Sequence, residues 1–163
     1  MLARPEPKGA ARLKQARLLA LLIPAGLLGG ALYSQYVGGL YPCEMCYWQR
    51  WPHGIAILLA MVALASPLEA ARTRLIVLLA ALLIAISGAI GVYHAGVELG
   101  WWEGITTCTA TGARSLQDIL HTPLIRCDQV QWSFLGISMA GWNAIISLIG
   151  AATIAGLALR KPA

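Results

Sequence analysis

Long apolar runs alternate with short polar and charged segments along this chain. Four apolar runs stand out, at about residues 18–37, 47–65, 75–93 and 138–159. Each is roughly 20 residues long, enough for an α-helix to cross a hydrocarbon core of about 30 Å. The pattern predicts an all-α integral membrane protein, with four transmembrane helices packed as a bundle.

The second of these spans is the least apolar. Its strictly apolar part covers only residues 54–65. The segment reaches membrane length only if Tyr47, Trp48 and Trp51 form an aromatic belt at the interface. We therefore expect its first turns to lie at the edge of the membrane.

Small residues recur at helical spacing in the first and fourth spans. Gly26 and Gly30 form a GxxxG pair, while Ser147 and Ala151 follow one face of the fourth span. Such faces allow two helix backbones to approach closely. The sequence predicts helix packing at both places.

Composition supports a membrane location over a soluble or nucleic-acid-binding domain. Hydrophobic residues make up 58% of the 163 positions and charged residues only 12%. The net charge of +5 does not come from a basic patch beside aromatic residues, since the basic residues lie at the ends of the apolar runs. We expect lipid as the surrounding medium and no nucleic acid as a partner.

The basic residues also predict the orientation of the spans. Five precede the first span, two lie between the second and third, and two follow the fourth, against three in the remaining connections. By the positive-inside rule, the basic tail of residues 1–17 and the end at 160–163 are cytoplasmic, and the loops at 38–46 and 94–137 face outward. We expect the first residues of the tail to carry no folded domain.

All four cysteines fall in the two outward loops, with Cys43 and Cys46 in the first and Cys108 and Cys127 in the second. On the oxidising side of a membrane this placement indicates disulfide chemistry. Two structural disulfides would give the same placement. Topology alone therefore leaves a redox enzyme and a disulfide-bonded scaffold both open.

The CxxC of Cys43 and Cys46 lies where the second span begins. If a helix starts there, Cys46 lies in its first turn, where free backbone N–H groups and the helix dipole stabilise a thiolate. Gln49 and Arg50 then share the face of Cys46. Arg50 either provides a cation beside the sulfur or extends toward the lipid headgroups.

A metal site is not expected from the four cysteines. Zinc sites with this ligand set combine two closely spaced pairs, and Cys108 and Cys127 are too far apart in sequence to form one. Two disulfides on one side can instead exchange through thiolate attack. An apolar pocket beside Cys46 and Arg50 would suit a lipid-soluble quinone as the electron acceptor.

The second outward loop begins with His94, at the outer end of the third span. His94 either carries protons for a redox reaction or is an interfacial histidine bonded to water and headgroups. Glu98 lies one helical turn further on and would pair with it in either case. The loop is long enough to indicate function, and residues 113–120 are predicted to form a short helix.

The segment from Pro42 to Arg50 forms a PCxxCxxQR motif, and Cys108, Cys127-Asp128 and the segment 132–136 follow later in the chain. In combination, these features resemble the DsbB family of membrane disulfide-forming oxidoreductases. The resemblance covers the chain from the first span onward. It implies a bacterial inner-membrane enzyme whose cysteines face the periplasm. Such an enzyme reoxidises a periplasmic DsbA-like protein of thioredoxin fold and passes electrons to the membrane pool of ubiquinone or menaquinone.

The resemblance also implies a role for each cysteine. Cys108 would be attacked by the partner thiolate and Cys127 released, Cys43 would exchange with Cys127, and Cys46 would face the quinone. Arg50 matches the quinone-site arginine of the family. Gln49 and His94 are further candidates for quinone contact.

Two other interpretations compete with this one. Enzymes of the vitamin K epoxide reductase type are also helical membrane proteins with a CxxC, but theirs lies near the last helices. A non-catalytic membrane scaffold would keep all four sulfurs in structural disulfides. The DsbB-like prediction differs from both in requiring a reactive CxxC at the entry to the second span.

Overall fold

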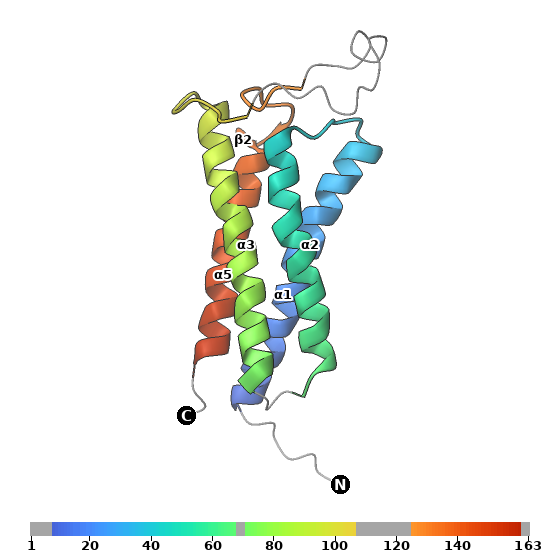
Figure 1. The fold of residues 1–163 in the computed structure, drawn as a ribbon, viewed down its shortest axis with the longest axis vertical. Helices are drawn as coiled ribbons and strands as arrows, with labels where there is room; N and C mark the ends of the chain where they lie inside the picture. Colours follow the sequence, from blue (N-terminus) through green and yellow to red (C-terminus); the bar gives the residue numbers. More distant parts are fainter. Residues whose placement is uncertain (1–7, 68–70, 107–124, 161–163) are drawn as a thin grey trace.

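The computed structural model describes residues 8–67, 71–106 and 125–160. These residues form four long helices and a two-stranded hairpin: α1 (Lys8–Tyr36), α2 (Glu44–Ala65), α3 (Ala71–Glu98), β1 (Ser133–Phe134), β2 (Ile137–Ser138) and α5 (Met139–Leu159). The helices run alternately up and down, with both ends of the chain at one end of the bundle (Figure 1). The α1–α2 connection and the β1–β2 hairpin lie at the other end. The prediction of a helical fold is confirmed for the described residues.

Three helices, α1, α3 and α5, are long and apolar enough to cross a membrane. The helix α2 is not among them. Its first half carries Glu44, Gln49, Arg50 and His53, which lower its hydropathy. The four-span count therefore stays a prediction.

The helices extend beyond the predicted spans. In particular, α1 begins at Lys8, and Leu13, Ala16 and Arg17 are buried in the bundle. The prediction of a tail over residues 1–17 is therefore wrong from Lys8 onward. Small and apolar residues between the basic positions give this part of α1 a face that packs against the other helices. At the other end, α3 continues to Glu98, so His94 lies in a helix and the second outward loop is shorter than predicted. The short helix predicted at 113–120 lies outside the described residues.

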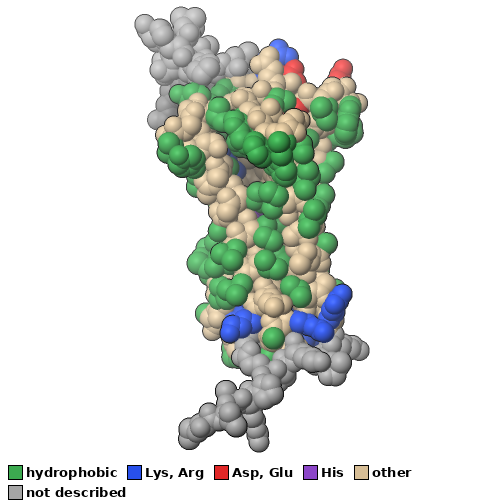
Figure 2. All heavy atoms as spheres, turned by 180° about the vertical axis from the view of Figure 1, so that it is seen from behind, with side chains coloured by type: hydrophobic (Ala, Val, Ile, Leu, Met, Phe, Trp, Pro, Cys, Tyr) green, Lys and Arg blue, Asp and Glu red, His purple; other side chains and the backbone are tan. Residues whose placement is uncertain are grey.

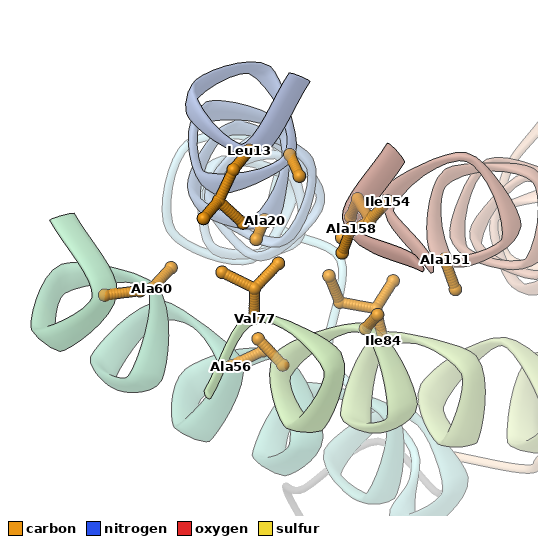
Figure 3. Packing of buried hydrophobic residues seen from close by; sticks show 13 residues of the cluster. Leu13, Ala20, Ala56, Ala60, Val77, Ile84, Ala151, Ile154 and Ala158 are labelled. Carbon is orange, nitrogen blue, oxygen red and sulfur yellow. The ribbon is translucent and has the colours of Figure 1, made fainter. Parts of the chain in front are cut away.

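The lower half of the bundle is closely packed through small side chains. Figure 3 shows Val77, Ile84 and Ile154 surrounded by alanines from the neighbouring helices. Higher up, Gly91 of α3 lies against the backbone of α5, where a Cβ atom would be 3.0 Å from the carbonyl oxygen of Ala140. Small residues thus set the close helix spacing, as expected for membrane helices.

The two predicted packing faces have different outcomes. Ser147 and Ala151 of α5 are buried, as predicted. Gly26 and Gly30 of α1 do not pack: a Cβ atom at either position would meet nothing within 4 Å. The prediction that this GxxxG pair packs against another helix is wrong, because both glycines line a cavity.

The surface agrees with a membrane protein. Figure 2 shows apolar side chains along the flanks of the bundle and a cluster of Lys and Arg at the end that carries the termini. Large apolar residues of every long helix are exposed, among them Leu22, Leu58, Leu82 and Ile149. Such a surface is unusual for a soluble monomer and suits lipid.

Arg17 ties α1 to the end of α2. It is buried, and its guanidinium donates to the carbonyl oxygens of Ala63 and, at 2.8 Å, Ser66. Ala63 lies in the last turn of α2 and Ser66 is its C-cap residue, whose backbone N–H also donates to the Ala63 oxygen at 3.2 Å. Carbonyl groups at a helix end lack their full set of helical N–H partners. The arginine both satisfies them and complements the negative end of the helix dipole.

Replacing Arg17 by Ala should destabilise the protein by about 2 kcal/mol, because the change leaves carbonyl groups in the last turn of α2 without their charged donor. Unfolding of the purified protein in mixed detergent would measure the loss. Lys14→Ala is the matched control, since Lys14 is an exposed basic residue in the same helix. Equal stability of the two variants would contradict the assigned role.

Candidate active site: a buried dithiol beside a cavity

Cys43 and Cys46 meet at the first turn of α2. Cys43 is the N-cap residue, and its sulfur accepts a hydrogen bond of 3.3 Å from the backbone N–H of Cys46. Pro42 precedes the cap and cannot supply a backbone N–H of its own. The two sulfurs lie 2.8 Å apart. The helix start therefore holds both thiols in contact, close enough for disulfide formation.

The two thiols differ in their affinity for a proton. The hydrogen bond with Cys46, followed by burial, raises the pKa of Cys43. The same hydrogen bond lowers the pKa of Cys46, to which the nearby Arg50 guanidinium adds. In the reduced pair, Cys46 is thus the thiol that gives up its proton more readily. This supports the prediction of a reactive Cys46.

His94 reaches the same site from α3. Its Nε2 atom lies 3.6 Å from Cys43 Sγ and 3.8 Å from a carboxylate oxygen of Glu98. On the other side of the ring, Nδ1 lies 2.9 Å from the amide nitrogen of Gln49. The histidine is buried, so the interfacial alternative, which needs water or headgroups around it, does not fit.

Arg50 turns inward toward α1. Its guanidinium donates to Gln35 Oε1 at 2.5 Å and to the carbonyl oxygen of Ala31 at 3.2 Å. The charged carbon also lies 5.4 Å from the ring centroid of Tyr47, a distance typical of a cation–π contact. These contacts hold the arginine beside the dithiol and contradict its extension toward the headgroups.

A cavity of about 270 Å³ lies next to the dithiol, between α1, α2 and α5. Its walls include predicted site residues, apolar and glycine positions of α1, and one tryptophan of α5: Gly26, Leu27, Gly30, Cys43, Cys46, Gln49, Arg50, His94 and Trp142. The structure thus brings five of the seven predicted site residues to one cavity. Mostly apolar walls with a few convergent polar groups are typical of a small-molecule site.

The second cysteine pair is described in part. Cys127 is buried in one cluster with Cys43, Met45, Val97 and Ile125. Its sulfur accepts a hydrogen bond of 3.2 Å from the Thr106 hydroxyl. Cys108 lies outside the described residues. Cys127 therefore lies in the same buried cluster as Cys43, and its exchange with that sulfur stays a prediction.

Sequence reasoning gave no role in the site to several polar residues of this region: Gln35, His53, Ser87, Asn143 and Ser147. His53 had a detectable signal, because Cys46, Gln49, Arg50 and His53 follow the i, i+3, i+4, i+7 spacing of one helix face. Asn143 and Ser87 are polar residues inside apolar spans, which is itself a sign of function or pairing.

Cys43, Cys46 and His94 have ligand atoms that all lie within 4.8 Å of one another, close enough to share a metal ion. The surroundings of His94 oppose it. The amide nitrogen of Gln49 donates to the carbonyl oxygen of Met45 at 3.1 Å and also faces Nδ1 of His94, which must therefore accept. A metal-binding Nε2 requires the proton on Nδ1. The donor set favours thiol redox chemistry.

Comparison with known proteins agrees with this chemistry. The family model described as "Disulfide bond formation protein DsbB" matches residues 13–157. A protein of Marinobacter nauticus named "Disulfide bond formation protein B" is 33% identical over 140 residues, covering 78% of this chain and 80% of the relative. Proteins with the same name from Polaromonas sp. and Chromohalobacter salexigens are each 32% identical, covering 89% and 91% of this chain and 94% of each relative. No solved structure matches. The chain therefore belongs to the DsbB family of disulfide bond formation proteins.

Proposed function

We propose that this chain binds a membrane quinone, ubiquinone or menaquinone, in the cavity beside Cys46 and passes to it the electrons of external thiols. Membership in the DsbB family makes it a membrane thiol-disulfide oxidoreductase that sustains disulfide formation in secreted proteins. Its partner in this proposal is a periplasmic DsbA-like protein of thioredoxin fold. The observation that carries the proposal is that the low-pKa sulfur, Cys46, and the fixed cation, Arg50, line the same cavity.

The cavity fits the ring of a quinone in its chemistry. Leu27, Leu28 and Trp142 give it apolar walls, and Gly26 and Gly30 leave space along α1. An arginine has five N–H donors, of which the contacts to Gln35 and Ala31 use only part. Arg50 would therefore hold a carbonyl oxygen of the ring, while Gln49 and His94 line the wall near Cys46. When bound, a quinone supplies an acceptor for two electrons and two protons.

The chain's own residues would supply the thiol steps. Reduced partner protein attacks Cys108, Cys127 leaves as a thiolate, and Cys127 then attacks Cys43 in the Cys43–Cys46 disulfide. That attack expels Cys46 as a thiolate beside the cavity. The proximity of Cys127 to Cys43 supports the exchange, and the low pKa of Cys46 makes it the better leaving group of the pair. The second thiolate of the partner then displaces Cys108, which leaves the partner as a disulfide, and the freed Cys108 attacks Cys127 and releases Cys43. The two electrons and two protons lost by the partner are then held by the reduced Cys43–Cys46 pair.

The same proposal sets the orientation in the membrane. Four spans would place both termini in the cytoplasm and the four cysteines in the periplasm of a bacterium. The gathering of basic side chains at the end with the termini supports this, as does the placement of the CxxC at the opposite end (Figures 1 and 2). In α2, the polar first turns would then lie at the periplasmic interface.

Replacing Arg50 by Met should weaken quinone binding about tenfold, since a hydrogen bond from a charged donor is lost. Quenching of tryptophan fluorescence on titration with a short-chain quinone would measure the affinity. Arg72→Met is the control, because Arg72 is an exposed arginine in α3 at the opposite end. Unchanged affinity in the Arg50 variant would remove this residue from the quinone site.

Replacing Gly30 by Leu should fill the cavity and lower quinone affinity by about tenfold or more. The fold should persist, because a Cβ atom at position 30 meets no neighbour within 4 Å. Gly156→Leu is matched, since a Cβ atom at that glycine of α5 also meets nothing. The cavity assignment would fail if both variants bound quinone like the unaltered protein.

Replacing Cys127 by Ser should trap the partner on Cys108, because the thiol that resolves the mixed disulfide is gone. A partner lacking its own resolving cysteine would be mixed with the folded variant in which Cys43 and Cys46 are oxidised to a disulfide, and the products analysed on non-reducing gels. The Cys108 thiolate opens that disulfide, the partner thiolate then attacks Cys108, and the two electrons remain on the reduced Cys43–Cys46 pair. We expect an adduct that dithiothreitol removes, and none with Cys108→Ser. Absence of the adduct with Cys127→Ser would contradict the role of Cys108.

A further inference from the structure

Six polar side chains form a continuous hydrogen-bonded chain inside the upper bundle. It runs from His53 of α2, through Asn143 of α5 and back to Gln49 of α2, then to His94 of α3 and finally to the dithiol. The helix α3 packs against both α2 and α5 (Figure 1), so the chain crosses three helices. Two backbone carbonyls fix the directions of the hydrogen bonds between His53 and His94.

The first fixed point is the Gln49 amide. Its nitrogen donates to the carbonyl oxygen of Met45, 3.1 Å away, which can only accept. Turning the amide over would place two oxygens against each other. The nitrogen therefore faces Nδ1 of His94 at 2.9 Å as a donor, and the oxygen of Gln49 is left to accept from the other side.

The second fixed point is the Asn143 amide. Its nitrogen lies 3.2 Å from the carbonyl oxygen of Ser87 and 2.7 Å from the oxygen of Gln49, both acceptors. Its own oxygen accepts from Ser147 Oγ at 3.1 Å and from His53 Nε2 at 2.9 Å. The two bonds that join His53, Asn143 and Gln49 therefore point the same way, from His53 toward Gln49.

The outcome is a fixed tautomer of His94. Because Nδ1 accepts, the proton of the neutral ring is on Nε2. That N–H faces Cys43 Sγ at 3.6 Å, an ordinary distance for a sulfur acceptor, and Glu98 at 3.8 Å, which is long for an oxygen acceptor. The backbone of Cys127 also faces the ring. The sulfurs of Cys43 and Cys46 lie 2.8 Å apart, within hydrogen-bonding distance.

We propose that Asn143 and His53 are positioning residues for the dithiol, because through Gln49 they hold His94 as an Nε2–H donor to Cys43. That donor strengthens the hydrogen bond from the Cys43 thiol to the Cys46 thiolate. Aligned hydrogen bonds polarise one another in a buried site. The titratable and charged groups that face Cys43 and Cys46 are His94, Cys127, Glu98 and Arg50. Of these, His94 is the donor whose proton position is set by the hydrogen bonds from His53, Asn143 and Gln49.

The inner end of the chain agrees with this direction. His53 Nδ1 is buried and has no hydrogen-bond partner among the described residues. With the proton of His53 on Nε2, the Nδ1 atom is an unpaired acceptor. The opposite tautomer would bury an unpaired N–H and also set Nε2 against Asn143 Oδ1, two acceptors facing each other.

The tautomer itself is directly measurable. Nitrogen-15 spectra of the reduced protein labelled at its three histidines, with His53→Gln and His121→Gln for assignment, should show His94 protonated at Nε2 and unprotonated at Nδ1. A His94 ring protonated at Nδ1 would overturn the proposal.

The consequence for the sulfur is tested in protein carrying Cys108→Ser and Cys127→Ser, without quinone or partner. We expect Asn143→Leu to slow iodoacetamide alkylation of Cys46 about tenfold at neutral pH and to move the rate profile to higher pH, because loss of a hydrogen bond to a charged system is worth about that factor. Thr153→Ala, an exposed polar residue of α5 outside the chain, should leave the rate and the profile unchanged.

Two substitutions of His53 separate the loss of its hydrogen bond from the loss of the side chain. In His53→Gln, the amide nitrogen reaches about as far as Nε2 and keeps the donor to Asn143, so the rate should be retained, whereas His53→Leu should slow it. Equal profiles for all four variants, with the same thermal stability, would overturn the proposal. It rests on the proposed role of Cys46 as the reactive thiolate. If the fluorescence titrations show no quinone binding while these rates respond, only the proposed function fails.

Discussion

A polar group buried between membrane helices must find its partner within the protein, because the hydrocarbon offers none. The upper half of this bundle is organised by that constraint. Gln49 meets it by donating to Met45 and His94 and accepting from Asn143, so that one amide joins α2, α3 and α5. The positions of the helices and the chemistry of the site are therefore set by the same hydrogen bonds.

Small residues have opposite effects in the two halves of the bundle. In the lower half, alanines such as Ala56 and Ala60 bring the helices together into a filled core. In the upper half, Gly26 and Gly30 leave space beside the dithiol. The bundle thus combines a filled core at one end with a cavity beside the dithiol at the other.

The dithiol owes its asymmetry to the start of α2. Cys43 is outside the helix and caps it, whereas Cys46 is in the first turn, near Arg50. The same motif in a loop would leave the two sulfurs equivalent. Family membership identifies the chemistry as disulfide formation, and the helix start explains why the two thiols divide their roles.

The sequence by itself determined the apolar spans, the gathering of cysteines away from the basic termini and the PCxxCxxQR motif, because these depend on composition and local spacing. It did not determine that residues 8–17 are helical, since a packing face with few apolar residues is hard to distinguish from a tail. It also could not pair Gln35 with Arg50, or Asn143 with Gln49 and His53. Those residues are far apart in the chain, and only the packing of α1, α2 and α5 brings them within hydrogen-bonding distance. The tertiary structure thus decided which polar residues support the reactive thiols.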